Sequence, residues 1–277
     1  MPQFHYEGTT YHYRVWGEQT TGSTMLQSSP LVLLHGFAQS THTWDEIASA
    51  FAQDRLVLAF DFVGHGESDH PEEPEAYQLS YLVDVLEAFI AEFFGQQRVI
   101  LLGYSMGGRV AASFAVAYPK RLDALILEAA GLGPRSDEER AALSERDTKL
   151  VRRLEESTVE EFMDFWEKLP LFTSQKNLDS DVQQKVRSAR LANDSHALAR
   201  TVAGSGQHAM PNIREAVADF PFPVLYVAGS KDKKYVGIAR SIESGNTEVA
   251  IVKAGHNVHL ENPLEFTRCV HRFLDTI

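Results

Sequence analysis

The stretch Arg98-Val-Ile-Leu-Leu-Gly-Tyr-Ser-Met-Gly-Gly-Arg109 decides how the rest of the chain is interpreted. Within it, Gly103-Tyr-Ser-Met-Gly107 has the G-x-S-x-G pattern of a nucleophile elbow, in which a serine stands at a sharp turn between a strand and a helix. The apolar residues before the turn predict a buried strand, and the Ala-rich segment 110–118 predicts a helix. The two glycines leave room for the strained backbone that such a turn requires. We therefore predict that Ser105 is an exposed nucleophile, followed by a Met106 N–H at a helix N-terminus, where negative charge is favoured.

Composition limits the class of protein. The 277 residues are 44% hydrophobic and 23% charged, which suits one large soluble domain with an insertion. The single cysteine, Cys269, cannot form an intramolecular disulfide, and its apolar neighbours favour a buried structural thiol in a reducing compartment. The N-terminus lacks the features of a signal peptide and no run has the ~20 apolar residues of a membrane span, so we expect a cytoplasmic protein. The net charge of −12 argues against nucleic acid as a partner.

Strand and helix patterns alternate along most of the chain. The predicted strands are 4–6, 11–16, 31–35, 56–60, 98–102, 122–127, 223–229 and 247–252, and residues 18–30 read as a loop. The predicted helices of this part are 78–94, 110–118, 236–242 and 263–274. This alternation is typical of an α/β fold with a mostly parallel, doubly wound, eight-stranded sheet.

The pattern changes at Gly131-Leu-Gly-Pro134, after which only helical segments are predicted up to about residue 210. Ser136-Asp-Glu-Glu139 and Thr158-Val-Glu-Glu161 have the form of capping boxes, which open helices. An insertion of this length is long for a crossover and indicates a lid. We therefore expect a core in two parts, 1–133 and 211–277, separated by a helical lid segment at 134–210. Residues 135–210 hold 12 Lys and Arg against 14 Asp and Glu, whereas the remainder holds 14 against 24.

A serine nucleophile needs a base and a group that orients the base. Asp232 and His256 each follow a predicted strand by four residues, at the sheet edge where catalytic residues of such folds lie. The order Ser105, Asp232, His256 is that of the α/β hydrolases. Glu128, at the end of the preceding strand, is the alternative acid, and Asp232 would then be a surface turn residue among lysines.

His256 is preferred to His259 as the base because Gly255 frees the backbone beside it, so His259 is expected to have a packing or supporting role. An oxyanion hole needs two convergent N–H donors. We predict that Met106 supplies one and Phe37, directly after His35-Gly36, supplies the other; a simple turn is the alternative for that loop. No metal site and no cofactor are expected for this chemistry.

These motifs resemble the α/β-hydrolase-fold superfamily over the whole chain. The residues that carry the resemblance are Leu34-His-Gly-Phe37, Gly64-His-Gly-Glu-Ser68 and Gly103-Tyr-Ser-Met-Gly107. Further features resemble the 2-succinyl-6-hydroxy-2,4-cyclohexadiene-1-carboxylate synthases of menaquinone biosynthesis. They are Gly103–Arg109, Phe162-Met-Asp-Phe-Trp-Glu-Lys-Leu-Pro-Leu-Phe172, Gly204-Ser-Gly-Gln207, Gly229-Ser-Lys-Asp-Lys-Lys-Tyr235 and Ala254-Gly-His-Asn-Val-His259.

The resemblance implies a cofactor-free carbon–oxygen lyase. In such an enzyme the triad removes a proton from a small anionic cyclohexene substrate that carries several carboxylates, and pyruvate leaves as a diene forms. By the same resemblance, Tyr104, Arg109, Trp166 and Arg190 match positions that line the substrate pocket. Arginine suits this role because it binds carboxylates through paired hydrogen bonds. The alternative for both arginines is a solvated place on a helix surface.

One position departs from the synthase pattern. The family usually carries another substrate arginine in the first lid helix, where this chain has Leu143. Arg140 and Arg146 lie one turn to either side and are candidates to replace it. The exact substrate depends on this point. Val63, where related loops often have proline, is expected to be harmless.

Three classes of function fit the residues to different degrees. The lyase is the first, and a serine hydrolase that cleaves carboxylic esters or C–C bonds through an acyl-enzyme is the alternative. The two differ in their need for arginines, because buried guanidinium groups without an anion are costly in an ester-binding pocket. A binding protein that has lost catalysis is the third class, and it would not need to keep all three triad residues.

Overall fold

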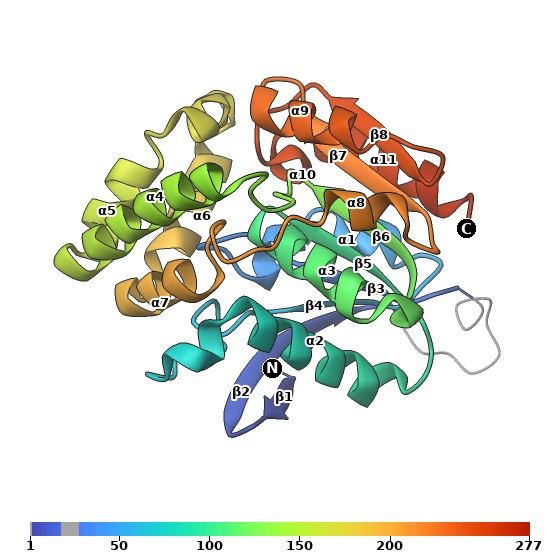
Figure 1. Ribbon diagram of the computed structural model, residues 1–277, viewed down its shortest axis with the longest axis horizontal. Helices are drawn as coiled ribbons and strands as arrows, with labels where there is room; N and C mark the ends of the chain where they lie inside the picture. Colours follow the sequence, from blue (N-terminus) through green and yellow to red (C-terminus); the bar gives the residue numbers. More distant parts are fainter. Residues whose placement is uncertain (1, 18–27) are drawn as a thin grey trace.

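One eight-stranded sheet runs through the molecule in the computed structural model, which describes residues 2–17 and 28–277 (Figure 1). The strand order is β1-β2-β4-β3-β5-β6-β7-β8. The strands are β1 (Gln3–Tyr6), β2 (Thr9–Trp16), β3 (Leu31–Leu34), β4 (Val57–Phe60), β5 (Val99–Tyr104), β6 (Leu122–Glu128), β7 (Val224–Gly229) and β8 (Thr247–Val252). The prediction of a mostly parallel α/β sheet is confirmed. The loop predicted at 18–30 lies outside the described residues except for its last three positions.

Only β2 runs against its neighbours, pairing antiparallel with β1 and with β4, while all later pairs are parallel. Glu7 and Gly8 join β1 to β2, and both have positive φ (47° and 84°), as a tight two-residue hairpin turn requires. Strands β3 to β7 are buried at almost every position, because helices cover both faces of a parallel sheet. Their carboxyl ends therefore meet along one sheet edge.

Helices pack on the two faces of this sheet. In Figure 1, α2 (Leu79–Phe94) and α3 (Met106–Ala117) lie together in front of the sheet, while α1 (Ala48–Phe51) lies behind it and contacts α11 (Pro263–Leu274). Shorter elements complete the core: η2 (Thr41–Trp44), η3 (Pro74–Tyr77), η4 (Pro119–Arg121), α8 (Arg214–Ala218), α9 (Lys233–Ser241) and α10 (Val258–Glu261). Cys269 on α11 is buried, as predicted.

Two predicted helix starts were too late. Helix α3 begins at Met106 rather than at residue 110, because the helix starts directly after the elbow and its glycines weaken the sequence signal there. Helix α9 begins at Lys233 rather than at residue 236. Asp232 is the N-cap of α9 and accepts a hydrogen bond from the Tyr235 N–H. The predicted catalytic acid, which follows β7, therefore also starts this helix.

The lid segment contains four helices and a 3₁₀ turn between β6 and β7, which Figure 1 shows grouped at one side of the sheet. They are α4 (Asp137–Glu156), α5 (Val159–Trp166), η5 (Pro170–Asn177), α6 (Ser180–Leu191) and α7 (Ser195–Ser205). Thr158 and Glu161 form a complete capping box. Ser136 also caps its helix, but Glu139 bonds the Arg135 N–H instead of the Ser136 N–H, so the first predicted box is only half formed.

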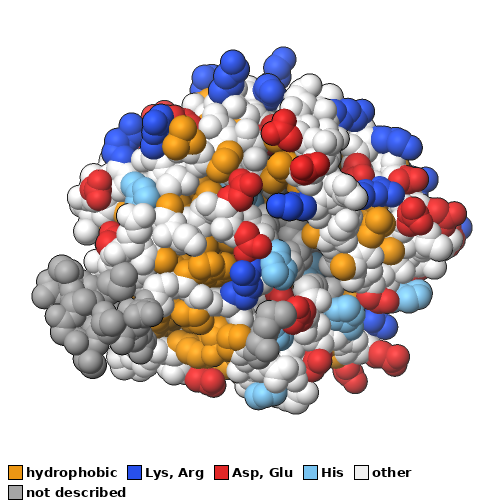
Figure 2. All heavy atoms as spheres, turned by 180° about the vertical axis from the view of Figure 1, so that it is seen from behind, with side chains coloured by type: hydrophobic (Ala, Val, Ile, Leu, Met, Phe, Trp, Pro, Cys, Tyr) orange, Lys and Arg blue, Asp and Glu red, His pale blue; other side chains and the backbone are white. Residues whose placement is uncertain are grey.

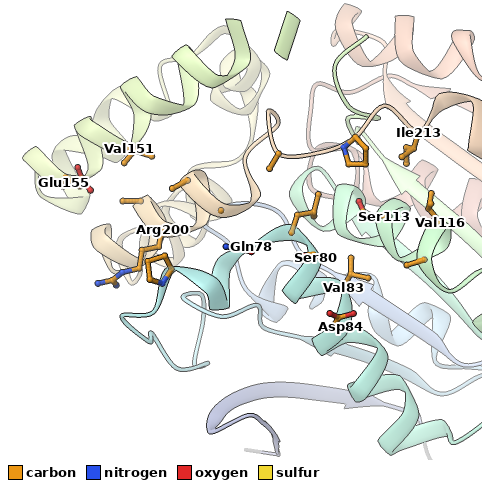
Figure 3. A pocket seen from close by; sticks show the side chains of 18 residues that line it. Gln78, Ser80, Val83, Asp84, Ser113, Val116, Val151, Glu155, Arg200 and Ile213 are labelled. Carbon is orange, nitrogen blue, oxygen red and sulfur yellow. The ribbon is translucent and has the colours of Figure 1, made fainter. Parts of the chain in front are cut away.

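The lid segment has its own apolar cluster. The cluster is made of Leu154, Phe162, Met163, Leu198, Ala199 and Val202, together with Ala38 from the loop after β3. A hollow of about 940 Å³ lies between the lid segment and the core, with Val83 and Val116 on the core side and Val151 and Arg200 on the lid side (Figure 3). None of the residues predicted to form the catalytic or substrate-binding site lines this hollow. The lid segment contacts the core through Ala38 in the loop that follows β3 and through the packing of α7 on η3.

The surface carries charges of both signs. Figure 2 shows Lys and Arg side chains along the upper edge of one face, with Asp and Glu spread over the same face. Among the described residues, no helix is long and apolar enough to cross a membrane.

Candidate active site

The turn between β5 and α3 has the geometry of a nucleophile elbow. Ser105 has a φ of 50° and a ψ of −102°, a strained conformation for a residue with a side chain. A Cβ at Gly107 would collide with the Leu34 carbonyl, and a Cβ at Gly103 would collide with the Gly107 backbone. Both glycines are therefore required by close backbone approach, and the Ser105 hydroxyl stands at the carboxyl edge of the sheet.

Ser105, His256 and Asp232 lie in one hydrogen-bonded chain. His256 Nε2 is 3.0 Å from Ser105 Oγ, and His256 Nδ1 is 2.7 Å from Asp232 Oδ2. His256 is 2% exposed and Asp232 is 8% exposed, so little water competes with these bonds. A hydroxyl, an imidazole and a carboxylate in this order can remove a proton from a substrate or activate the serine for attack.

Glu128 lies beside the other histidine. Its carboxylate accepts hydrogen bonds from the N–H groups of Val258 (2.5 Å) and His259 (3.0 Å) and is 2.6 Å from His259 Nδ1. His259 Nε2 in turn is 2.8 Å from Thr43 Oγ1. Glu128 and His259 thus anchor the segment that follows His256, and no hydrogen bond joins Glu128 to His256.

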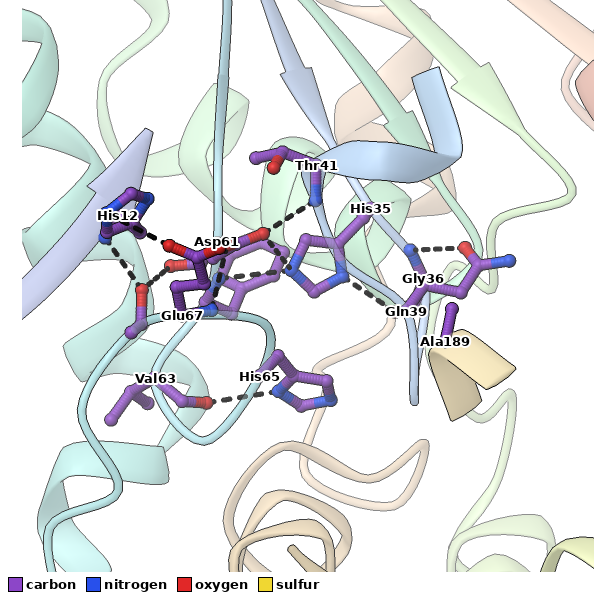
Figure 4. A network of polar contacts seen from close by, with 12 residues as sticks. His12, His35, Gly36, Gln39, Thr41, Asp61, Val63, His65, Glu67 and Ala189 are labelled. Atoms are coloured by element: carbon purple, nitrogen blue, oxygen red, sulfur yellow. Dashed lines mark hydrogen bonds and ion pairs between the residues drawn. The ribbon is translucent and has the colours of Figure 1, made fainter. Parts of the chain in front are cut away.

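The loop after β3 is held by a buried polar network, shown in Figure 4. The Phe62 N–H donates to His35 Nε2 (3.1 Å), so His35 Nδ1 carries the proton and donates to the Gly36 carbonyl (2.8 Å). Burial lowers the pKa of His35 to about 4, which keeps its ring neutral. Because Gly36 O and Phe37 N belong to one peptide, fixing the carbonyl also fixes the direction of the Phe37 N–H.

One small pocket collects most of the predicted site residues. Ser105 and His256 line it. Phe37 and Met106, which are predicted to form the oxyanion hole, line it as well. So do the four residues that are predicted to bind substrate: Tyr104, Arg109, Trp166 and Arg190. Asp232 lies behind His256 and lines a neighbouring hollow instead. Among the described residues, the N–H groups of Phe37 and Met106 have no hydrogen-bond partner, so both are free to bind an oxyanion.

The two predicted arginines have different surroundings. Arg109 is 8% exposed, and its Nη2 donates to the Ser205 carbonyl (2.8 Å), while its Nε has no partner within the described parts of the chain. Burial lowers its pKa, and no described carboxylate lies within ion-pair distance of it. Arg190, by contrast, pairs with Glu167 (3.0 Å) and donates to Gln175 Oε1 (3.0 Å). Of these two arginines, Arg109 is the one buried without a counter-charge among the described residues.

The sequence left open the choice between Arg140 and Arg146, and it assigned no role to several other residues that line the pocket. Arg146 lines the pocket, whereas Arg140 bonds the carbonyls of His208 and Met210 at the end of the lid segment. The pocket is also lined by Asp147, Leu150, Leu171, Phe172, Gln207 and Tyr235. Helix periodicity alone could not have found them, because it does not tell which helix face turns toward the core. Within the described residues, no group of His, Cys, Asp and Glu has the arrangement of a metal site.

Known proteins resemble this chain over most of its length. Residues 29–263 match the family described as alpha/beta hydrolase fold. A Bacillus subtilis (strain 168) protein, provisionally named a 2-succinyl-6-hydroxy-2,4-cyclohexadiene-1-carboxylate synthase, is 37% identical over 90% of this chain and 92% of the relative. The synthase of that name from Enterobacter sp. (strain 638) is 29% identical over 88% of this chain and 91% of the relative. The structure of MenH from S. aureus matches with a TM-score of 0.89 at 29% identity, over 96% of this chain and 98% of that chain. The chain belongs to the α/β hydrolase fold family and, within it, to the family of the 2-succinyl-6-hydroxy-2,4-cyclohexadiene-1-carboxylate synthases.

Proposed function

We propose that the protein is a cofactor-free lyase that eliminates pyruvate to form 2-succinyl-6-hydroxy-2,4-cyclohexadiene-1-carboxylate. The observation that carries this proposal is Arg109, a buried guanidinium without a carboxylate partner, one helical turn after Ser105. Burying an unpaired charge is costly, so such a group is expected where a ligand supplies the opposite charge. An ester hydrolase has no need of it.

Ser105 and His256 would act as the base in this reaction. His256 takes the proton of the Ser105 hydroxyl, and the serine oxygen removes the ring proton beside the succinyl ketone, with Asp232 stabilising the imidazolium. The electron pair of that C–H bond forms the new ring double bond, and the C–O bond to the enolpyruvyl group breaks. The departing enolate takes up a proton and becomes pyruvate. Phe37 and Met106 N–H groups would stabilise the ketone oxygen as negative charge develops on it.

Charge in the pocket supports an anionic substrate. The product name contains two carboxylates, and the pyruvate that leaves carries a third. Arg109, Arg146 and Arg190 line the pocket; Arg146 pairs with Asp147 and Arg190 with Glu167, so Arg109 supplies the positive charge that has no partner. The protein as a whole has a net charge of −12, so local positive charge is needed to attract a trianion. In a poorly hydrated pocket these charges act strongly, because screening is weak there.

The test is pyruvate release by the wild-type protein from the ring substrate that carries the enolpyruvyl group, beside turnover of a small neutral ester. Arg109→Ala should lower kcat/KM for pyruvate release by about 30- to 900-fold, which corresponds to ~2–4 kcal/mol. The exposed Arg98 is the matched control, and Arg98→Ala should change neither reaction. Ester turnover should be nearly unaffected by Arg109→Ala. Efficient ester turnover without pyruvate release would show that the protein is a serine hydrolase.

A further inference from the structure

Glu261, the last residue of α10, reaches back along the chain to the loop that carries His256. Its Oε2 accepts a hydrogen bond from the Gly255 N–H (2.6 Å), and Gly255 directly precedes His256. Its Oε1 accepts a second hydrogen bond from the Ser174 hydroxyl (3.0 Å), and Ser174 belongs to η5 of the lid segment. One carboxylate thus contacts the lid segment and the His256 loop at the same time.

The peptide between Ala254 and Gly255 is held on both sides. Its carbonyl accepts a hydrogen bond from the Lys231 N–H (3.0 Å), and its N–H donates to the carboxylate just described. Because a peptide unit is planar, these two bonds fix the direction in which the chain enters His256. Lys231 directly precedes Asp232, so the same peptide also joins the loop of the histidine to the loop of its carboxylate partner.

Gly255 is a glycine because of the room that this contact needs. Its φ does not lie in the left-handed region, so the need for glycine does not come from that backbone conformation. A Cβ at Gly255 would collide with the Ser174 hydroxyl and would lie 2.7 and 2.9 Å from the two carboxylate oxygens of Glu261. A contact from the lid segment, rather than a freer backbone, therefore explains the glycine before His256.

The 3₁₀ turn η5 borders His256 on two sides. On the pocket side, Phe172 lines the pocket, and its ring centre is 6.2 Å from that of His256. On the Asp232 side, Ser174 lines a hollow of about 460 Å³ together with Asp232 and His256. Neither Ser174 nor Glu261 lines the pocket itself, so their contact can affect the histidine without touching a bound substrate.

The carboxylate of Glu261 depends on these two hydrogen bonds for its orientation. Among the described residues, Glu261 has no ion-pair partner, and Ser174 and Gly255 are the groups that donate to it. Hydrogen bonds to a carboxylate are stronger than those between neutral groups. Removal of the Ser174 hydroxyl would therefore free one oxygen and leave the other with a less firmly held carboxylate.

We infer that Glu261 is a positioning residue that couples docking of the lid segment to the orientation of His256, with Ser174 as the contact from the lid. The inference rests on the proposed function for the reaction in which His256 acts. When η5 docks, the Ser174 hydroxyl orients the carboxylate, the carboxylate holds the Gly255 N–H, and the His256 ring is aligned within the triad. When the lid segment is away, the ring is held less firmly, so proton transfer is favoured over an enclosed substrate.

The first measurement is the proton NMR signal of the Nδ1–H that His256 shares with Asp232. Hydrogen bonds between a histidine and a carboxylate give proton signals far downfield of the backbone amides, and the pair of His259 and Glu128 supplies a second signal as an internal reference. Ser174→Ala should shift or broaden the His256 signal and leave the His259 signal in place. His256→Gln and His259→Gln assign the two signals.

The second measurement is kcat for pyruvate release. Glu261→Ala should lower kcat about tenfold or more and Ser174→Ala about fivefold, while KM changes by less than about threefold because neither residue lines the pocket. Glu261→Gln should recover most of the loss, because its amide can accept from the Gly255 N–H and donate to the serine oxygen. The double variant should be no slower than Glu261→Ala, because the serine acts only through the carboxylate.

Matched controls are Ser157→Ala, which removes a hydroxyl that donates to the Arg153 carbonyl within the lid segment, and Glu265→Ala on the exposed face of α11. Both should stay within about twofold of the wild type. Wild-type kcat in Ser174→Ala, an unmoved His256 signal in that variant, or additive losses in the double variant would each overturn the coupling.

The two measurements separate this inference from the proposed function. If the wild type releases no pyruvate but the His256 signal moves in Ser174→Ala, the coupling stands and the proposed function fails. If the wild type releases pyruvate and the His256 signal does not move in Ser174→Ala, the proposed function stands and the coupling fails.

Discussion

Two histidines three positions apart, His256 and His259, contact different carboxylates. His256 meets Asp232 and the Ser105 hydroxyl, whereas His259 meets Glu128 and the Thr43 hydroxyl. At the scale of single residues, these partners determine which histidine can pass a proton to and from a substrate. His256 lines the pocket, whereas His259 and Glu128 are buried in the core.

The triad assignment predicts large losses of turnover. Ser105→Ala and His256→Ala should each lower kcat for pyruvate release by ~10³-fold or more. Both should still bind 2-succinylbenzoate, an aromatic dicarboxylate with the same two side groups as the proposed product. Asp232→Asn should be similarly severe because it disturbs the tautomer and orientation of the His256 ring. Steady-state kinetics and calorimetry on the same preparations measure both quantities.

Glu128→Gln serves as the control for the acid. Glu128 accepts two backbone hydrogen bonds and one from His259, so its replacement should lower the free energy of unfolding by ~1–3 kcal/mol. Its effect on kcat should be much smaller than that of Asp232→Asn. Nearly normal turnover in folded Asp232→Asn, together with a severe loss in Glu128→Gln, would show that the acid has been assigned to the wrong residue.

At the scale of elements, the polar network behind the loop that follows β3 makes stability depend on pH. Burial lowers the pKa of His35 to about 4 and that of His65 to about 3, from 6.5 in the unfolded chain. Below pH 6.5 the unfolded state therefore binds protons that the folded state does not, and stability falls as the pH falls. Each histidine should contribute a slope that starts at about half of ~1.4 kcal/mol per pH unit at pH 6.5 and approaches the full value about one unit lower. Asp61 acts in the opposite direction, because burial raises its pKa.

Urea unfolding of the wild type between pH 5.0 and 6.5 tests this dependence. Averaged over this range, His65→Gln should reduce the slope of unfolding free energy against pH by about 1 kcal/mol per unit, whatever its effect on stability at neutral pH. The exposed His5 provides the control, and His5→Gln should leave the slope as it is. An identical slope in wild type and His65→Gln would mean that His65 is protonated in the folded protein.

At the scale of the whole molecule, the pocket is small and is lined by residues of both the core and the lid segment. Its volume is about 80 Å³, below the roughly 300 Å³ at which pockets for small ligands begin. Trp166 and Phe172 from the lid pack near Phe37 and His256 of the core. We propose that residues 134–210 move as a unit to admit the substrate and close again on it.

This motion predicts protection from proteolysis. Saturating 2-succinylbenzoate should slow cleavage within residues 134–210 several-fold, because the bound ligand contacts lid and core together. Cleavage within residues 211–277 provides the internal reference. Limited proteolysis followed by mass spectrometry locates the cuts. Equal cleavage of the lid with and without bound ligand would contradict a lid that closes on the substrate.

Local pattern in the sequence determined the elements of this protein. The strand, turn and helix around Ser105 depend on residues next to one another, as do the alternation of strands and helices and the Thr158 cap, so they could be predicted from the chain alone. Only the tertiary structure decided which acid lies beside His256, whether Arg140 or Arg146 faces the pocket, and which buried arginine lacks a counter-charge. Asp232 and Glu128 both end strands, and Arg140 and Arg146 are on one helix. Their difference lies in contacts with residues far away in the sequence, and those contacts exist only once the chain has folded.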